Sequence, residues 1–324
     1  MFDLAFQNLV SPMVLFFVLG VAAALARSDL SIPEPVAKLL ALYLLMSIGF
    51  RGGVEVAHQG VDGTMIAAIA AGIALSFLMP FLAYLMLRTT SRLDAVNAAA
   101  VAAHYGSISA VTFVAVTGTL GQLGIAWDGY MVAVGAAMET PAILAALLIA
   151  RGRTDAATPG QSRGALLREV ALNGSIVILL GAFVIGALTG ARGAAMLKPF
   201  LNDAFAGVLC LFLLDMGLVA GRGLAQGRRH LSLPVTVFGV AMPLIGGALA
   251  AGLAWIIGLS VGSTAVLITL AASASYIAVP AAMRLALPQA NPAIALTLSL
   301  GITFPFNLLV GIPLYIALAG RIAP

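Results

Sequence analysis

The chain has 324 residues, of which 62% are hydrophobic and 9% charged, and this composition excludes a water-soluble protein with a charged surface. The mean hydropathy of +1.10 instead indicates a membrane protein. The formal net charge is +4, but in such a protein the side of the membrane on which Lys and Arg lie matters more than their total.

Ten apolar runs are long enough to cross a bilayer as helices, which takes roughly 20 residues each. They cover residues 12–27, 35–51, 64–88, 95–119, 130–151, 172–190, 204–221, 234–258, 263–285 and 294–319. Little of the chain remains for a soluble domain, so the predicted fold is an all-α membrane protein with ten transmembrane helices. The first run has no basic region before it and no small-residue cleavage pattern, and we expect it to stay in the mature protein.

The basic residues predict how these helices are oriented, because cytoplasmic loops carry an excess of Lys and Arg. Most of them flank the loops after runs 1, 3, 5, 7 and 9: Arg27, Lys38, Arg88, Arg92, Arg151, Arg153, Arg163, Arg168, Arg222, Arg228, Arg229 and Arg284. The opposite side holds only Arg51, Arg192, Lys198 and Arg321. We therefore predict a multi-pass protein of the plasma (inner) membrane with both termini facing outward.

The fourth run is interrupted at its centre by small and polar residues. Residues 101–113 read VAAHYGSISAVTF and include Gly106, Ser107, Ser109 and Thr112. A helix that opens at mid-depth must be buried in protein or line a watery cavity, and its free amides favour an anion while its free carbonyls favour a cation. The hydroxyls suit a small oxyanion. The alternative is that the serines bond back to the preceding turn of an unbroken helix.

Two acidic residues lie inside apolar runs, where a carboxylate is expensive and usually functional. Glu139 is in the fifth run just before Pro141, whose missing N–H frees a carbonyl upstream. Its carboxylate could bind sodium or carry a proton; alternatively, it is protonated and hydrogen-bonded within the bundle. Asp215 in the seventh run could pair with Arg222, two turns away, and tie helices together. His104 could relay protons, but a lone histidine among alanines is more often a satisfied interior residue.

The two halves of the chain repeat each other. An offset of 168 residues brings Ser107 onto Ser275, and an offset of 164 brings Pro141 onto Pro305. Because each half holds five runs, an odd number, the second half enters the membrane from the opposite side, which makes an inverted repeat typical of secondary transporters. The predicted divisions are the first repeat at 1–151, a cytoplasmic linker at 152–171 and the second repeat at 172–324.

The matching positions of the second half carry further candidate residues. Ser273, Ser275 and Tyr276 lie in the ninth run, where the fourth run has its break. Thr303 and Asn307 occupy the tenth-run counterpart of the surroundings of Glu139 and could complete the shell of a cation. Matching breaks in two inverted halves predict a binding site inside a transporter.

Other residues have simpler interpretations. The basic linker at 152–171 is predicted to contact anionic headgroups, with a regulatory protein as the alternative. Asn291 is predicted to cap a helix, and Arg284 to extend to the membrane interface rather than to hold an anion's exit path. The single cysteine, Cys210, leaves no partner for an intramolecular disulfide. The chain has no metal or nucleotide motif, so we expect no enzyme activity, no nucleic-acid partner and no cofactor besides sodium as a coupling ion.

A set of motifs resembles the sodium-dependent bicarbonate transporter family first known from cyanobacteria, over nearly the full chain: SPMVLFFVLG, SIPEPV, IGFRGG, YGSISAVTF, METPAIL, AASASYIAVPAAMRLALPQANP and GIPLY. The resemblance implies a gate domain from runs 1, 2, 6 and 7 and a core domain from runs 3–5 and 8–10. It also implies a homotrimer that carries bicarbonate with sodium. Bicarbonate would lie between residues 106–112 and 273–276, and Glu139 matches the family's acidic residue before a proline.

The chain differs from the cyanobacterial form at two positions of these motifs. Tyr276 stands where that form has an aspartate, and Val111 where it has a serine. The linker, which bears on binding of the family's PII-like regulatory protein, is also much shorter. The predicted function is secondary active transport of bicarbonate coupled to sodium by alternating access. The alternatives are a sodium-coupled organic anion carrier, in which Tyr276 contacts a larger substrate, and an anion-binding channel or sensor.

The predicted site follows from both lines of argument. The substrate-binding residues are Gly106, Ser107, Ser109, Thr112, Ser273, Ser275 and Tyr276. The sodium-binding residues are Glu139, Thr112, Thr303 and Asn307. No catalytic residue is predicted.

Overall fold

The computed structural model describes residues 10–60, 62–151, 172, 174–227, 232–276, 279, 280, 283, 287 and 289–324. These residues form helices joined by loops, with no β-strand among them, which confirms the all-α prediction. Six of the described helices are long and apolar enough to cross a membrane: Glu34–His58, Gly63–Thr90, Val177–Asp203, Phe205–Leu224, Leu233–Ile257 and Pro292–Ile322. Other apolar helices are shorter, so ten transmembrane helices stay a prediction. The linker at 152–171 and Arg284 lie outside the described residues.

The helices of the first half begin close to the predicted runs, but the second run continues to Gln59, past its predicted end at residue 51. They are α2 (Pro12–Leu25), α3 (Glu34–Gln59), α4 (Gly63–Thr90), α5 (Ala95–His104), α6 (Ala110–Gln122), α7 (Met131–Ala137) and α8 (Glu139–Arg151). The side chains of Ser11, Asp62, Asp94 and Ser109 each accept a hydrogen bond from a first-turn amide. These caps determine where α2, α4, α5 and α6 begin.

The second half contains longer helices and three π-helical segments. They are α10 (Gly174–Lys198), η1 (Pro199–Asp203), α11 (Phe205–Gly227), α12 (Leu233–Ile257), α13 (Val261–Ala271), α15 (Pro292–Leu298), η3 (Ser299–Thr303), α16 (Phe304–Phe306), η4 (Asn307–Gly311) and α17 (Ile312–Ile322). The sixth run is interrupted at residue 190, where the sequence predicted its end. Gly190 has a φ of 52° and non-helical backbone angles, so α10 consists of two helical segments joined by a kink at this glycine, the second of which ends at Lys198.

The tenth run is a continuous helix with two widened turns. Pro305 lies in α16, between η3 and η4. Proline has no N–H to donate and its ring crowds the preceding turn, and π-helical turns relieve such a conflict without ending the helix. Thr303 and Asn307 therefore lie on irregular turns beside Pro305, where the regular pattern of backbone hydrogen bonds is interrupted.

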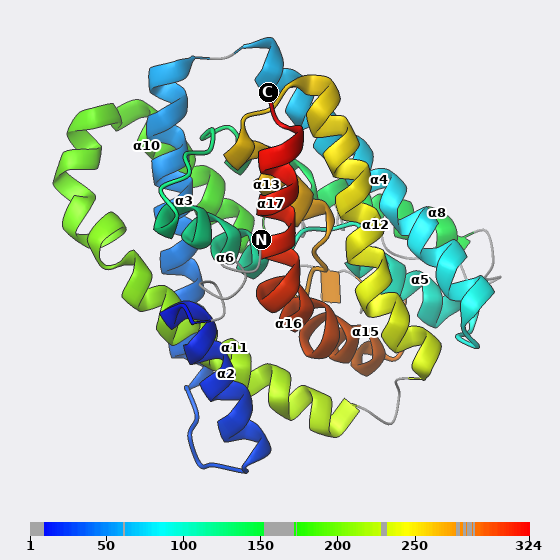
Figure 1. The fold of residues 1–324 in the computed structure, drawn as a ribbon. Coiled ribbons are helices and arrows are strands. Elements are labelled where there is room, and N and C mark those ends of the chain that lie inside the picture. The colour runs from blue at the N-terminus through cyan, green and yellow to red at the C-terminus, as the bar shows by residue number, and fades with distance from the viewer. Residues whose placement is uncertain are drawn as a thin grey trace.

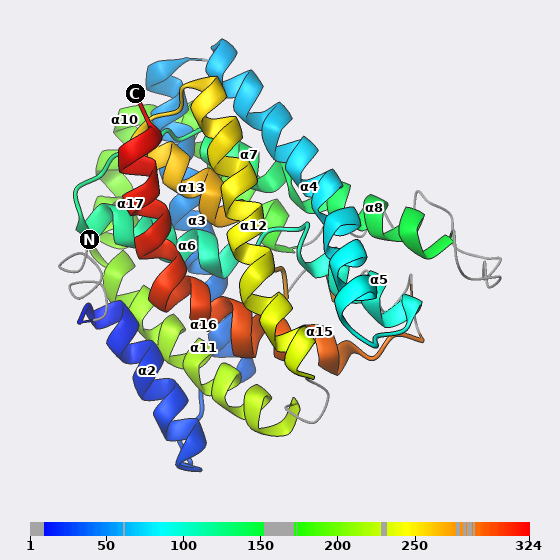
Figure 2. The same ribbon diagram turned by 45° about the vertical axis from the view of Figure 1, so that its right-hand side comes forward.

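The helices fall into two groups that Figure 1 separates. On one side lie α2, α3, α10 and α11, the helices of the predicted gate, and on the other lie α4, α5, α8 and α12 of the predicted core. The short helices α6 and α13 stay in the middle of the molecule in both views (Figure 2). Ten of the thirteen residues of α6, and ten of the eleven of α13, are buried. The broken runs are therefore enclosed by the longer helices.

Glycines bring the gate helices together in two crossings. At the crossing of α2 with α11, a Cβ on Gly20 or on Gly217 would overlap the backbone of the partner helix. At the crossing of α3 with α10, the same is true of Gly49 and Gly186. In lipid, helices associate through close packing, which small residues allow. Gly49 and Gly217 are separated by the 168-residue offset, so the two crossings use corresponding positions of the two halves.

Candidate functional site

Residues 105–109 separate α5 from α6 and form the break in the fourth run. All five are buried. Gly106 lies against α4, where a Cβ would overlap Pro80 and the Ser76 carbonyl, so this approach of two backbones requires glycine. The Ser109 hydroxyl accepts a hydrogen bond from the Thr112 amide at 3.1 Å and caps α6. The fourth run is thus broken where its polar residues predicted.

A second break, at residues 272–276 after α13, contacts the first. The Ser275 amide donates to the His104 carbonyl at 2.7 Å, and His104 Nδ1 lies 2.6 Å from the Ser275 carbonyl oxygen. A carbonyl can only accept, so Nδ1 carries the proton. The Ser109 amide donates to Ser273 Oγ at 2.9 Å. His104 is therefore a satisfied interior histidine, and it joins the two breaks.

The first turn of α6 contains amides available to a ligand. The amide of Thr112 donates to the Ser109 hydroxyl and that of Phe113 to the Ser109 carbonyl. The amides of Ala110 and Val111 have no partner among the described residues. Free amides at a buried helix N-terminus are a ready-made anion site. The sequence predicted free amides at this break, and the structure identifies Ala110 and Val111 as residues that supply them.

Glu139 lies at the start of α8 with one polar neighbour. Its side chain is 6% exposed, and Ser107 Oγ donates to Glu139 Oε2 at 2.5 Å. A cavity of about 10 Å³ adjoins it, roughly the space of one water molecule. Leu45 of α3 and Leu179 of α10 line this cavity opposite Ile108. Glu139 therefore faces the seam between the two helix groups.

Ser76 of α4 positions the start of α8. Its hydroxyl donates to the Met138 carbonyl at 2.5 Å and accepts from the Ala142 amide at 3.1 Å. These two backbone groups are four residues apart and would bond each other in an uninterrupted helix. The hydroxyl stands between them and separates α7 from α8 just before Glu139. Sequence reasoning missed Ser76, although a lone serine in the apolar third run was the available signal.

Thr303 and Asn307 belong to networks other than that of Glu139. Thr303 Oγ1 donates to the Gly239 carbonyl at 2.7 Å and lies 2.6 Å from the Tyr105 hydroxyl. Asn307 Nδ2 donates to the Ala272 carbonyl, the first of the second break, at 2.8 Å. Within the described residues no hydrogen bond joins either side chain to Glu139. The structure thus places the four predicted sodium residues around both breaks rather than in one shell.

Tyr276 and Asp215 are two polar residues for which the sequence left more than one role open. The Tyr276 hydroxyl lies 3.8 Å from Met216 Sδ of α11, and its ring packs edge-on against Phe304 at 6.1 Å. Tyr276 therefore bridges the second break and the gate helices. Asp215 is buried. Arg222, the partner predicted for Asp215, donates from Nη2 to the Leu30 carbonyl at 2.6 Å, and its charge also acts on Asp215.

Two polar contacts, which we call clamps, join the halves at opposite ends of the broken helices. In the Asp128 clamp, the Asp128 amide donates to Ser263 Oγ at 2.9 Å, and Asp128 Oδ2 accepts from the hydroxyls of Ser263 at 2.5 Å and Ser260 at 2.7 Å. In the Asn97 clamp, the Asn291 amide donates to Asn97 Oδ1 at 2.7 Å. Asn291 also caps α15, as predicted.

The clamps are equivalent under exchange of the halves. An offset of 163 maps Asp128 onto Asn291, and an offset of 166 maps Asn97 onto Ser263. Asp128 precedes the last run of the first half, and its amide donates to Ser263 in the first turn of the broken ninth run. Asn291 precedes the last run of the second half, and its amide donates to Asn97 in the first turn of the broken fourth run. Contacts that come in such exchanged pairs are what a two-fold relation between the halves produces.

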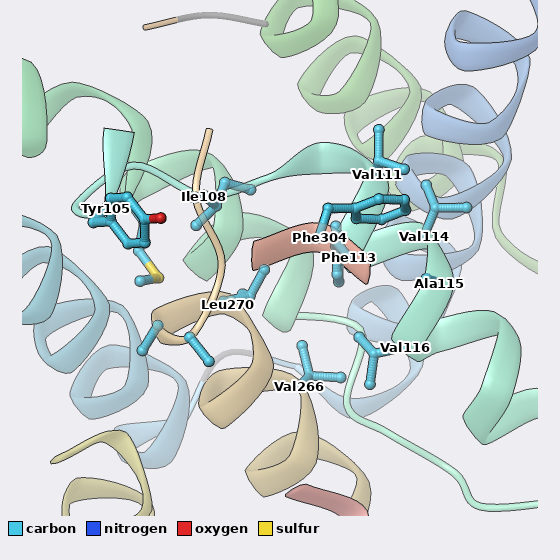
Figure 3. Packing of buried hydrophobic residues seen from close by; sticks show 14 of the residues in the cluster. Tyr105, Ile108, Val111, Phe113, Val114, Ala115, Val116, Val266, Leu270 and Phe304 are labelled. Carbon is cyan, nitrogen blue, oxygen red and sulfur yellow. The ribbon is translucent and has the colours of Figure 1, made fainter. Parts of the chain in front are cut away.

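Apolar side chains fill the space around the breaks. Figure 3 shows Ile108 and Phe113 from the first break and α6 together with Leu270 of α13, and all three belong to one buried cluster. Close packing of this kind fixes the few polar groups that it surrounds. Among the described residues, no group of three His, Cys, Asp or Glu side chains could hold a metal ion. A cation at Glu139 would need hydroxyl and carbonyl oxygens.

Comparison with known proteins agrees with the motifs and the broken helices. The family model of the Na+-dependent bicarbonate transporter superfamily matches residues 12–320. The chain belongs to the Na+-dependent bicarbonate transporter superfamily. This match covers the residues of both breaks, both clamps and Glu139. No curated protein matches the chain. Membership in a transporter superfamily and the long apolar helices identify a multi-pass membrane protein.

Proposed function

We propose that the protein carries bicarbonate together with sodium by alternating access. The observation that carries this proposal is the contact between two helix breaks, one from each half, deep inside a membrane protein. Opened backbone at this depth is tolerated only where it is buried in protein or lines a cavity, and transporters use it to bind ions. Membership in the superfamily supports both the anion and the coupling ion.

Bicarbonate is proposed to bind at the N-terminus of α6. The free amides of Ala110 and Val111 supply donors, and the helix dipole favours negative charge there. Hydroxyls can donate a hydrogen bond to one oxygen of bicarbonate and accept one from its O–H. Chloride has no O–H, so a chloride site needs no such acceptor. The proposed bicarbonate site comprises the predicted residues at the two breaks and in the first turn of α6: Gly106, Ser107, Ser109, Thr112, Ser273, Ser275 and Tyr276.

Sodium is proposed to bind at Glu139. The Ser107 hydroxyl that now donates to the carboxylate turns its oxygen to the ion when sodium binds, so both side chains become oxygen ligands of a hard cation. A buried carboxylate is stabilised when a cation neutralises it, and bicarbonate nearby is stabilised by the same cation. This mutual dependence couples the two ions. Thr112 would add to this shell, while Thr303 and Asn307 would serve a second sodium near Ala272.

The proposed architecture is ten transmembrane helices in two inverted repeats, residues 1–151 and 172–324. Runs 1, 2, 6 and 7 would form the gate and the other six the core. The exchanged pairs of glycine crossings and of clamps support this arrangement. Each clamp joins core helices of both halves, so the proposed core moves as one unit against the gate.

The proposed setting is a homotrimer in the plasma membrane with both termini outward. The basic residues on one side of the membrane support this orientation. The linker at 152–171 then lies in the cytoplasm, where its arginines would meet anionic headgroups or a PII-like regulatory protein.

Uptake into proteoliposomes tests the proposed function. Purified protein is reconstituted, and uptake of labelled bicarbonate is followed under an inward sodium gradient and under an equal potassium gradient. We expect accumulation with sodium only, because the superfamily to which the chain belongs is Na+-dependent. Equal uptake in both gradients would reject coupling, and uptake that stops at equilibration in the sodium gradient would indicate a channel.

A further inference from the structure

A groove of about 160 Å³ lies between α12 and α17, and at its floor a Cβ on Gly247 would stand 3.8 Å from the Cβ of Ala272, the first residue of the second break. Its sides are apolar, with Leu244 and Ala248 on α12 and Leu314 and Leu318 on α17. Tyr315 and Arg321 are its only residues with polar side chains. Both helices belong to segments long and apolar enough to cross the membrane, so the medium that meets the groove is the bilayer rather than water.

The groove has an open rim and a buried floor. Leu244, Ala248 and Leu314 at the rim are exposed, whereas Gly247 and Tyr315 are buried. Gly247 leaves the space empty: a Cβ there would stand 3.4 Å from Tyr315 Cε1 and 3.3 Å from Ile268 Cγ2. A side chain larger than alanine at this position would fill the floor. The groove is therefore a shaped feature of two packed helices that opens toward the lipid.

We propose that this groove binds an anionic phospholipid, with part of an acyl chain in the groove and the phosphate on Arg321. A cavity of about 150 Å³ holds one benzene molecule, so the groove takes roughly six carbons of a chain. Arg321 lies in the last turn of α17 and is exposed, where its planar guanidinium can hold a phosphate with two parallel hydrogen bonds. Apolar sides with a single cation at one end fit a lipid better than a soluble anion or a neutral hydrocarbon.

A chain of hydrogen bonds leads from the groove to the second helix break. The Tyr315 hydroxyl donates to Asn307 Oδ1 at 3.0 Å, and Asn307 Nδ2 donates to the Ala272 carbonyl at 2.8 Å. An acyl chain against the Tyr315 ring holds this hydroxyl in place and so orients Asn307. The lipid thereby stabilises the form of the break seen here. This second step rests on the proposed function, in which Asn307 serves a sodium ion.

Lipid binding is tested without transport. The full chain in neutral detergent is titrated with dioctanoyl phosphatidylglycerol, or with dioctanoyl phosphatidylcholine, and bound lipid is counted by native mass spectrometry. We expect the anionic lipid to bind the wild type at least tenfold more tightly than the neutral one. Ala248→Phe fills the groove and Arg321→Gln removes the cation, so each should lower binding of the anionic lipid about tenfold, the weakening that loss of a charge-assisted contact produces.

Two matched variants control for general surface effects. Leu249→Phe adds the same ring to the neighbouring, exposed position outside the groove, and Arg192→Gln removes an exposed basic residue on another helix. Both should bind the anionic lipid as the wild type does. Unchanged binding to Ala248→Phe and Arg321→Gln, or an equal loss in the control variants, would overturn the proposal.

The link to the break is tested by removing one hydroxyl. Tyr315→Phe keeps the ring that contacts the lipid but loses the bond to Asn307. We expect phosphatidylglycerol in the vesicles to lower the sodium concentration for half-maximal uptake by the wild type about fivefold, the effect of one hydrogen bond, and to have no such effect on Tyr315→Phe. An equal lipid effect in both proteins would overturn the link. If the protein does not carry bicarbonate at all, the binding measurement still decides the lipid site.

Discussion

Glu139 is buried among apolar side chains and has the Ser107 hydroxyl as its neighbour in hydrogen-bonding distance. A carboxylate in such surroundings is stable when it is protonated or when a cation neutralises it. Glu139→Gln keeps the shape and one oxygen but removes the charge. Loss of a charge-assisted contact costs about 1.5–3 kcal/mol, so sodium for half-maximal uptake should rise roughly tenfold to a hundredfold.

The same variant separates sodium binding from proton transfer. Uptake is measured against sodium concentration at two pH values. If Glu139 carries a proton instead, Glu139→Gln should lose the pH dependence while its sodium dependence stays unchanged. That result would contradict the sodium role, and a variant that matches the wild type in both respects would make Glu139 a structural residue.

Ser76 is predicted to act on sodium through the position of Glu139. Ser76→Ala lets the Met138 carbonyl bond the Ala142 amide directly, so α7 and α8 can join into one helix and Glu139 shifts. We expect a loss of stability of about 1 kcal/mol and a higher sodium requirement. Ser299→Ala is the matched control, because Ser299 Oγ is buried without a partner in the described part of the chain. Thermal unfolding and sodium titration of both variants check this, and an unchanged sodium requirement in Ser76→Ala would refute it.

At single residues, the sequence predicted which positions are polar and buried but not their partners. A polar residue in an apolar run is unfavourable unless it has a structural or functional role. This predicted that the breaks contain Ser107, Ser109, Ser273 and Ser275. Their bonds to Glu139, to each other and to His104 depend on how two distant halves meet, which spacing along the chain does not contain. Free amides at the break were predicted, but not that Ala110 and Val111 supply them, because this depends on the residue at which α6 begins.

Among the elements, the clamps are expected to hold the two breaks in register. Asp128→Ala removes the acceptor of the Ser260 and Ser263 hydroxyls, and Asn97→Ala removes the acceptor of the Asn291 amide. Each should cost about 1–2 kcal/mol of stability and raise the bicarbonate concentration for half-maximal uptake. The two variants should behave alike, because the clamps are equivalent.

Asp62→Ala is the control for the clamps. Asp62 also caps a helix, accepting the Met65 amide at 2.8 Å, but it joins no second element through that bond. Its loss should cost about 1 kcal/mol of stability with no change in half-maximal uptake. Unfolding in detergent and bicarbonate titration in vesicles measure both effects. A normal bicarbonate requirement in both clamp variants would show that the clamps serve stability alone.

The helices themselves were largely predictable, since apolar length and capping residues are local properties of the chain. The kink of α10 at Gly190 lies where the sequence predicted the end of the sixth run, but the second helical segment, which ends at Lys198, was not predicted. The widened turns around Pro305 were also missed. A proline signals a conflict with the helix, but the surrounding helices decide whether the helix ends, bends or widens.

For the whole molecule, motif offsets and an odd number of runs per half predict an inverted repeat, which stays a prediction. The packing partners of each helix could not be predicted. That α2 packs on α11 and α3 on α10 follows from glycines whose close approach is visible only once both backbones are placed. The division into gate and core follows from the resemblance and stays a prediction.

The central claim is that a clamped core moves against the gate, and two disulfides test it most directly. A Cβ on Gly301 would lie 3.6 Å from Leu224 Cβ of α11, and a Cβ on Gly239 would lie 3.4 Å from Ile302 Cβ. Both separations are close to the mean of about 3.8 Å in disulfides. Both pairs are made in a Cys210→Ala background. Leu224→Cys with Gly301→Cys links the gate to the core. Gly239→Cys with Ile302→Cys, which uses the residue next to Gly301, links two helices within the core.

Sodium-driven bicarbonate uptake is measured before oxidation, after oxidation and after reduction. The account predicts that oxidation stops uptake in the gate-to-core pair, that reduction restores it, and that the pair within the core carries bicarbonate throughout. Undiminished uptake by the oxidised gate-to-core pair, with the disulfide verified, would contradict the account.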